Sequence, residues 1–260
     1  MKNYDLITIS TPSNTEVYYY NLPIIYDYTQ PERNQRIATD PSPEEPLAER
    51  QLRALKRKMR YYKNVVFVIR RLVDANYTPR SSFLTLTQDP KREGFFGSDV
   101  KEGMHQLNLF MKRLRYYLKK QHPRFELKYL STWELQKNQN VHFHIILFDF
   151  PFVPIETMAK LWGHGGIDLH RIDKCGINEV GLYVAKYFSK DVDLKGKGYK
   201  QKAYTCSRNL KSPVVKKIYC PDFDIKDYGT PNYHSQYSIP KEKTGKAQDI
   251  RVDYYNIPKI

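Results

Sequence analysis

Between residues 49 and 121, the spacing of apolar side chains predicts a helix, a strand and a second helix. The first helix is expected over residues 49–75, which contain few helix breakers. Its apolar side chains recur at helical intervals at Val65, Ile69, Leu72 and Val73. Residues 83–87 (FLTLT) alternate leucine with phenylalanine and threonine before an Asp-Pro step, which is typical of a strand. Residues 100–120 carry an apolar stripe opposite faces rich in lysine and arginine, so a helix that packs on a sheet is predicted there. The stripe consists of Met104, Leu107, Phe110 or Met111, Leu114 and Leu118.

Two strands joined by a hairpin are predicted next. Residues 125–135 (FELKYLSTWEL) and 141–150 (VHFHIILFDF) are strand-like, and the polar QKNQN between them suits a hairpin connection. A short helix near 155–161, a strand within 165–173 and a helix within 178–191 follow. Because strands and helices mix without strict alternation, the predicted fold class is α+β with an antiparallel sheet, rather than a doubly wound fold.

The two ends of the chain have weaker patterns. Residues 1–50 are rich in Pro, Asn, Thr and Tyr, and predict an irregular arm and linker that could include short strands. Residues 51–195 are expected to form the main domain together with its preceding basic helix. Residues 196–260 are polar and Tyr-rich, and are interpreted as a C-terminal extension packed on the same domain.

Charge adds information about the partner. The chain has 43 Lys+Arg against 28 Asp+Glu, a formal net charge of +15. Residues 1–50 hold four basic and eight acidic side chains, so the remaining 210 residues carry +19. A basic body with 14% aromatic residues suits a polyanion whose bases can stack on rings. Basic enzymes without a nucleic-acid partner exist, so charge alone leaves both classes open.

The compartment can also be inferred from composition. No apolar run is long enough to cross a bilayer, and the N-terminus lacks a signal-peptide pattern. The three cysteines, Cys175, Cys206 and Cys220, are odd in number and lack ligand-like spacing. A reducing, cytoplasmic location without membrane contact is therefore expected, and a zinc or disulfide role is disfavoured.

His142 and His144 lie two residues apart in a strongly apolar strand. Side chains alternate across a strand, so both imidazoles should project from one face. Two neighbouring imidazoles are natural ligands for a divalent cation, and Glu134, across the predicted hairpin, could be the third. Such a set would leave coordination sites open and would tolerate Mn²⁺ or Mg²⁺. The alternative is that both histidines are structural, as core residues or on an exposed sheet face.

Residues 183–190 (YVAKYFSK) contain two overlapping Y-x-x-K units, Tyr183–Lys186 and Tyr187–Lys190. In a helix the two tyrosines are i and i+4, so both hydroxyls emerge on one face. A phenol beside a metal-bound phosphate and a cation can act as a nucleophile. An amphipathic helix with tyrosine at its boundary is the structural alternative, because the chain contains 22 tyrosines.

Taken together and in order, FLTLT, HFHIILF and YVAKYFSK resemble motifs I, II and III of the HUH endonucleases, which initiate rolling-circle replication of small phages and plasmids. The doubled tyrosine is similar to the two-tyrosine initiators of isometric single-stranded DNA phages. The resemblance covers roughly residues 80–191, and residues 1–50 and those after 200 lie outside it.

The resemblance implies a central antiparallel HUH/RRM-like sheet of about five strands flanked by helices, with the metal-binding strand near its middle. It assigns the site residues as follows: His142, His144 and Glu134 as metal ligands, Tyr183 and Tyr187 as nucleophiles, and Lys186 and Lys190 as helpers. The third ligand varies in position within the family, so Glu134 is the weakest of these assignments.

The implied activity is nicking of single-stranded DNA at an origin, with a 5′-phosphotyrosine and a free 3′-OH, followed by strand rejoining. Its partners would be single-stranded or hairpin DNA, and host helicase and DNA polymerase in a bacterial cytoplasm. A relaxase or single-strand transposase of the same superfamily, or a non-catalytic nucleic-acid-binding protein, are the alternatives.

Overall fold

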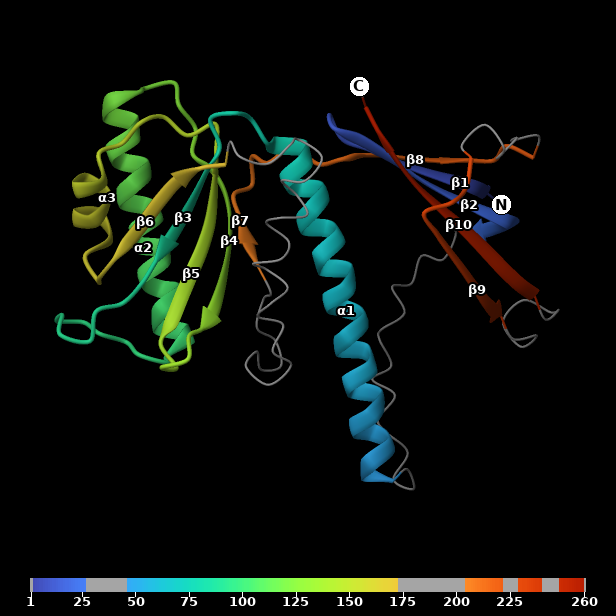
Figure 1. Cartoon of the computed structure of the whole chain (residues 1–260), viewed down its shortest axis with the longest axis horizontal. Helices are drawn as coiled ribbons and strands as arrows, with labels where there is room; N and C mark the ends of the chain where they lie inside the picture. Colours follow the sequence, from blue (N-terminus) through green and yellow to red (C-terminus); the bar gives the residue numbers. More distant parts are fainter. Residues whose placement is uncertain (1, 27–45, 173–203, 222–228, 240–247, 260) are drawn as a thin grey trace. The chain divides into compact units, whose positions relative to one another are not determined.

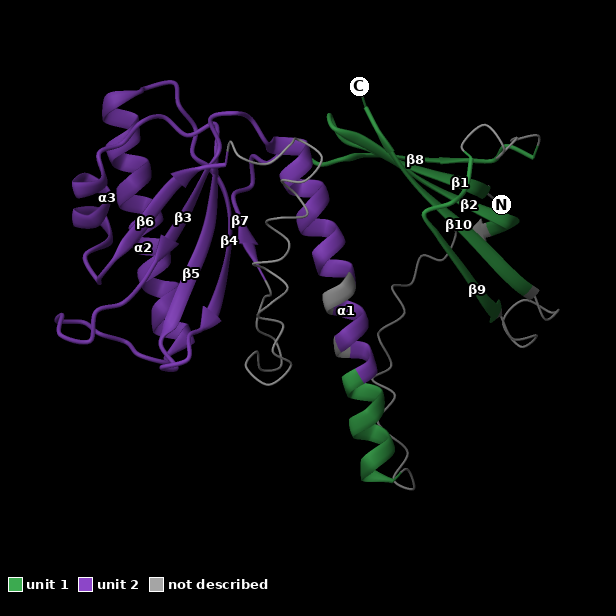
Figure 2. Ribbon diagram, in the orientation of Figure 1, with its two compact units in different colours: residues 1–55, 212–260 green, residues 56–211 purple. Residues whose placement is uncertain are grey.

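The computed structural model describes residues 2–26, 46–172, 204–221, 229–239 and 248–259. The chain forms two compact units, one made of residues 1–55 and 212–260 and the other of residues 56–211 (Figure 2). The second unit contains β3 (Ser82–Leu86), α2 (Val100–Gln121), β4 (Lys128–Leu135), β5 (Val141–Phe148), α3 (Ile155–Trp162), β6 (Ile167–Arg171), β7 (Thr205–Cys206) and most of α1 (Leu47–Asn76).

The sheet of residues 56–211 has five antiparallel strands in the order β6-β3-β5-β4-β7 (Figure 1). All eight residues of β5, the central strand, are buried. A tight turn joins β4 to β5, in which the Gln136 N–H donates to the Asn140 carbonyl at 3.0 Å and Gln139 has a positive φ of 64°. The α+β class, the five-stranded antiparallel sheet and the hairpin are therefore confirmed.

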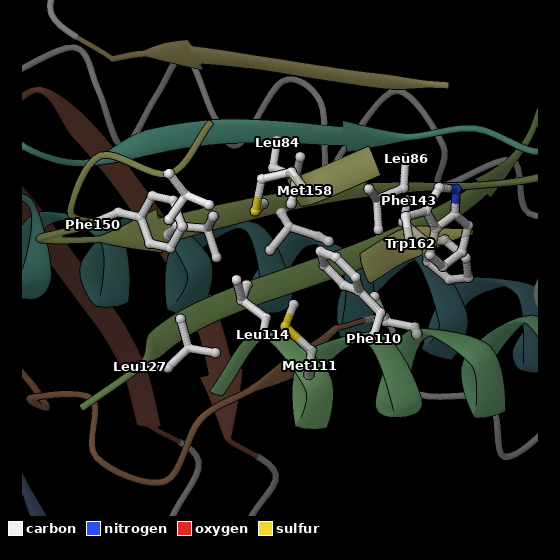
Figure 3. Close-up of a cluster of buried hydrophobic side chains, with 14 of the residues drawn as sticks. Leu84, Leu86, Phe110, Met111, Leu114, Leu127, Phe143, Phe150, Met158 and Trp162 are labelled. Atoms are coloured by element: carbon white, nitrogen blue, oxygen red, sulfur yellow. The ribbon is translucent and has the colours of Figure 1, made fainter. Parts of the chain in front are cut away.

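One face of this sheet carries the larger core, which α2 and α3 cover. Leu84, Leu86 and Phe143 from the strands pack with Phe110 of α2 and Trp162 of α3 (Figure 3). The apolar stripe predicted on α2 is buried as far as Leu107, Phe110, Met111, Leu114 and Leu118 are concerned. The helix begins after Asp99, whose carboxylate accepts the N–H groups of Lys101 and Glu102, as an N-cap does.

The opposite face of the sheet carries a second, smaller core. Here Val65, Ile69 and Val73 of α1 pack against Phe83 of β3 and Ile146 of β5. These three α1 residues are buried and lie on one side of the helix, as their spacing predicted. The packing leaves His142 and His144 farther along the same face of β5, because side chains of one parity share a face.

A second sheet was not predicted from the sequence. It forms in the other unit, in the order β8-β1-β2-β10-β9, with antiparallel pairs throughout. Its strands are β1 (Lys2–Ser10), β2 (Asn14–Tyr26), β8 (Val214–Ile218), β9 (Tyr233–Ile239) and β10 (Gln248–Pro258). Its small core contains Leu6, Val17 and Tyr255.

The expected irregular arm was thus wrong for residues 2–26, where two long strands form. Their outer partners, β8 and β10, lie about 200 residues farther along the chain, so no local pattern could reveal the pairing. Pro23 was also misleading, because proline removes a ladder N–H. It lies in the four-residue stretch of β2 that separates the Leu6–Tyr19 pair from the Tyr4–Ile24 pair, where the register shifts.

Candidate metal centre

The hairpin of β4 and β5 places the candidate ligands on one face of the sheet. Glu134 is the direct cross-strand partner of His142, and Thr132 is the partner of His144. Directly opposed residues of an antiparallel pair have neighbouring side chains on the same face. The two-residue spacing of the histidines then brings both imidazoles to a single carboxylate.

The distances fit a ligand group. His144 Nε2 lies 2.9 Å from Glu134 Oε1, and His142 Nε2 lies 3.9 Å from the same oxygen. The two imidazole rings are 4.6 Å apart between centroids, at an angle of 73°. One candidate ligand atom from each of the three residues lies within 4.8 Å of the others. The structure thus brings together all three predicted ligands, including Glu134, the weakest of the assignments.

Burial and charge set the protonation of this group. Both histidines are only 6–7% exposed. Burial, with a further contribution from the neighbouring His144, lowers the pKa of His142 to about 4, and Glu134 acts in the opposite direction. His142 is therefore neutral at pH 7 and keeps a lone pair available for a cation.

The residues present also fit a divalent cation by their chemistry. Two imidazole nitrogens and one carboxylate oxygen are a common donor set for such ions and leave further coordination positions open. Among the described residues, the buried His142 Nδ1 has no hydrogen-bond partner. Its Nε2 faces Glu134, the atom through which His142 could bind an ion. The site is thus a possible metal centre, and the donor set does not distinguish Mn²⁺ from Mg²⁺.

Polar side chains extend from the centre across the sheet. Asp168, Thr85 and His144 are paired in one row across β6, β3 and β5. In the adjacent row the Phe83 ring lies 5.6 Å from the His144 ring and 5.5 Å from the His170 ring. This row separates the polar end of the face from the apolar contact with α1.

Asp168 and His170 were not predicted to lie near the histidine pair. Both are exposed, and His170 Nδ1 lies 3.7 Å from Asp168 Oδ2. The sequence contained a signal, since an acid and a histidine two residues apart must share a strand face. Only the pairing of β6 with β3 shows that this face is the one that bears His142 and His144.

The tyrosine segment lies outside the described residues. Tyr183, Lys186, Tyr187 and Lys190 all fall within 173–203. Their positions relative to the metal centre therefore stay a prediction.

Positive charge belongs to the unit that contains the metal centre. Residues 56–211 hold 30 Lys+Arg and 14 Asp+Glu, a formal net charge of +16. The other unit holds 13 and 14, a net charge of −1. A polyanion would therefore be attracted to the unit that carries Glu134, His142 and His144.

Residues 81–192 match the family of replication-associated proteins described under the name ORF2. The matched segment starts just before β3 and includes the three candidate ligands, and it supports a replication initiator. Neither the curated proteins nor the solved structures contain a match to this chain. Within the part of the chain that the structure describes, no helix combines the length and apolar character needed to cross a bilayer.

Proposed function

We propose that this chain initiates rolling-circle replication by nicking single-stranded DNA through a tyrosine and later rejoining the strands. The observation that carries the proposal is the convergence of Glu134, His142 and His144 on adjacent strands of a segment similar to replication-associated proteins. The +16 charge of the same unit supports a polyanionic substrate.

In this proposal His142, His144 and Glu134 hold a divalent ion, Mn²⁺ or Mg²⁺. When bound, such an ion polarises the scissile phosphate and stabilises negative charge on its oxygens. The β4–β5 hairpin fixes the three side chains on one rigid face, so little reorganisation is needed when substrate binds. The neutral state of His142 keeps this group ready to bind at neutral pH.

The proposed nucleophiles are Tyr183 and Tyr187. The phenolic oxygen of one tyrosine forms a bond to phosphorus while the bond from phosphorus to the 3′-oxygen breaks. The phenol loses its proton and the leaving 3′-oxygen gains one, so the products are a 5′-phosphotyrosine and a free 3′-OH. Lys186 and Lys190, one turn along the expected helix, would steady the phosphate or help to deprotonate the phenol.

Two tyrosines on one helix suit a second transfer. After host polymerase has extended the 3′-OH around the circle, the second tyrosine attacks the regenerated junction. The released 3′-OH then displaces the first tyrosine and closes a circle. Each step exchanges one phosphodiester for another, so the chemistry needs no ATP, and strand separation falls to a host helicase in the bacterial cytoplasm.

The test is a covalent adduct assay. The full-length protein is incubated with hairpin-bearing single-stranded oligonucleotides from candidate origins and Mn²⁺, and denaturing gels are used to detect a protein–DNA band. The expected result is an adduct with the wild type, loss of the adduct with Tyr183→Phe/Tyr187→Phe, and retention of one transfer step in each single variant. Full activity in the double variant would contradict the assignment of the nucleophiles.

The same assay addresses the alternatives. A relaxase or a single-strand transposase would also form an adduct, but on a transfer-origin or transposon-end substrate instead of a replication origin. A non-catalytic DNA-binding protein would shift the oligonucleotide in a native gel without any nick or adduct.

A further inference from the structure

A cavity of about 540 Å³ lies at the β7 edge of the sheet in residues 56–211. Its walls come from the C-terminal part of α2, the segment that leads into β4, and the residues after β7. The wall is held in place locally, because the Ser207 N–H donates to the Tyr129 carbonyl at 2.9 Å and the Tyr129 N–H donates to Ser207 Oγ at 3.1 Å. Tyr129 and Glu134 have opposite parity on β4, so this cavity and the metal centre use different faces of that strand.

Three cations line the cavity. Arg115 and Lys119 lie one turn apart on α2, and Arg208 comes from the segment after β7. In the described parts of the chain, none of the three has a carboxylate within ion-pair distance. Glu126 is the one carboxylate among the described lining residues, and it accepts a hydrogen bond from Asn209 Nδ2 at 3.3 Å. Three cations against one carboxylate make the cavity a favourable place for an anion.

The cavity offers more than charge. Phe125 and Tyr129 are half-buried lining residues, and they present aromatic surface beside the cations. Burial raises the pKa of the Tyr129 phenol, against the effect of Arg115, so this hydroxyl stays a neutral donor. Asn209 and Glu126 add an amide and a carboxylate that can pair with the edge of a base. The volume lies in the range of small-molecule sites and exceeds the needs of a bare phosphate ion.

We propose that this cavity binds one nucleotide, with its phosphate on Arg115, Lys119 and Arg208 and its base against Phe125 and Tyr129. The chemistry is the same for a nucleotide within a single DNA strand and for a free nucleoside monophosphate. The site goes beyond the proposed nicking activity, because it needs neither the metal ligands nor the tyrosines. Cation–phosphate pairs and stacking on aromatic rings are the two contacts by which single-stranded nucleic acid is usually held.

Cys206 provides a local readout, because its exposed thiol lines the cavity. The full-length protein in EDTA is alkylated with iodoacetamide, and mass spectrometry follows Cys206 with Cys220 as the internal reference. The probes are thymidine 5′-monophosphate, a short oligothymidylate, thymidine and inorganic phosphate.

We expect the monophosphate or the oligothymidylate to slow alkylation of Cys206 at least threefold without slowing that of Cys220. Protection by the monophosphate identifies a free nucleotide as sufficient, and protection by the oligothymidylate alone identifies a nucleotide within a strand. The proposal is overturned if neither probe protects Cys206, or if thymidine or inorganic phosphate protects it equally well.

A matched pair of variants tests the cations. Arg115→Gln/Lys119→Gln removes two lining charges, whereas Lys112→Gln/Lys120→Gln removes two charges from the same helix that do not line the cavity. The first variant should weaken the concentration dependence of Cys206 protection by about tenfold or more, and the second by about twofold or less. Equal losses in both variants would show diffuse attraction instead of a site, and circular dichroism checks that both are folded.

Glu126→Gln gives the opposite sign. Removal of this lining carboxylate should strengthen protection by the same probe several-fold, because one repulsive charge near the phosphate is lost. Weaker protection in this variant would contradict the placement of the phosphate. The outcome is independent of nicking, since Tyr183→Phe/Tyr187→Phe should keep Cys206 protection whether or not it forms adducts.

Discussion

Glu134 connects the two histidines, because its Oε1 lies 2.9 Å from His144 Nε2 and 3.9 Å from His142 Nε2. A carboxylate in this position can balance the charge of a divalent ion and can orient His144 when no ion is bound. The same geometry makes Glu134 the residue at which metal binding and hydrogen bonding are most easily separated.

The first prediction concerns this carboxylate. Glu134→Gln keeps the shape of the side chain but removes its charge, so Mn²⁺ affinity measured by isothermal titration calorimetry should fall about tenfold or more. Asp168→Asn is the matched control, since Asp168 lies on the same face two strands away and outside the ligand group. His142→Ala/His144→Ala should abolish the isotherm before it abolishes the fold. Equal effects of the Glu134 and Asp168 variants would refute the ligand assignment.

The second prediction concerns pH. The pKa of His142 is about 4 in the fold against 6.5 for an unperturbed histidine, so the unfolded chain binds more protons between these values. In EDTA, His142 should therefore lower the free energy of unfolding by about 1.4 kcal/mol for each unit of pH fall within that window. The effect vanishes above pH 6.5, where both states are neutral.

Urea denaturation at several pH values measures this effect. His142→Gln is the control, because glutamine does not titrate and its difference from the wild type isolates the histidine. A wild-type curve parallel to that of His142→Gln from pH 6.5 to pH 4 would show that burial does not hold His142 neutral.

At the scale of elements, α2 approaches the sheet closely at Gly103. A Cβ there would lie 2.9 Å from Phe96 Cε2 and 3.2 Å from Val141 Cγ1, closer than side chains normally pack. Glycine at this position therefore allows α2 to seat its apolar stripe over β5, the strand that carries His142 and His144. The metal centre thus depends on a helix that contributes no ligand to it.

The third prediction follows from this contact. Gly103→Val should destabilise the unit by about 1–3 kcal/mol through overpacking against Phe96 and Phe143, in spite of the better helix propensity of valine. The exposed position Lys112 of the same helix is the control, and Lys112→Val should change stability by less than about 1 kcal/mol. Urea denaturation gives both values, and equal midpoints for the two variants would contradict a tight contact at Gly103.

Most elements of the replication-associated segment could be predicted from sequence because their signals are local. The strand expected at 83–87 is found at Ser82–Leu86, and the helix expected at 100–120 is found at Val100–Gln121. Regular alternation or a helical apolar stripe records which face is buried, and needs no knowledge of the partner. The two-residue strand β7 had no comparable signal, since it is a strand only through its pairing with Leu130 and Ser131.

At the scale of the whole molecule, the two ends of the chain join in one sheet. Strand β10 lies between β2 and β9, so a segment near the C-terminal end completes a sheet begun by the first ten residues. This sheet belongs to a unit of formal charge −1, whereas the unit with the metal centre carries +16.

The fourth prediction uses this connection. Removal of residues 248–260 takes away the central partner of both β2 and β9, and leaves edges that cannot bury Val17. Amide hydrogen exchange of β1 and β2 should then become fast, whereas that of β3, β4 and β5 stays slow and Mn²⁺ binding is retained. The full-length chain is the reference, and slow exchange of β2 in the truncated chain would show that this sheet does not depend on β10.

The sequence by itself determined the order of elements in residues 81–171 and the pairing of His142 with His144 on one strand face, because both follow from periodicities of two and 3.6 residues. Only the tertiary structure decided that Glu134 reaches both imidazoles, that Asp168 and His170 share their face, and that residues 2–26 pair with the C-terminal strands. The physical reason is that strand pairing between distant segments depends on backbone hydrogen bonds and shared burial, which leave little trace in the local order of side chains.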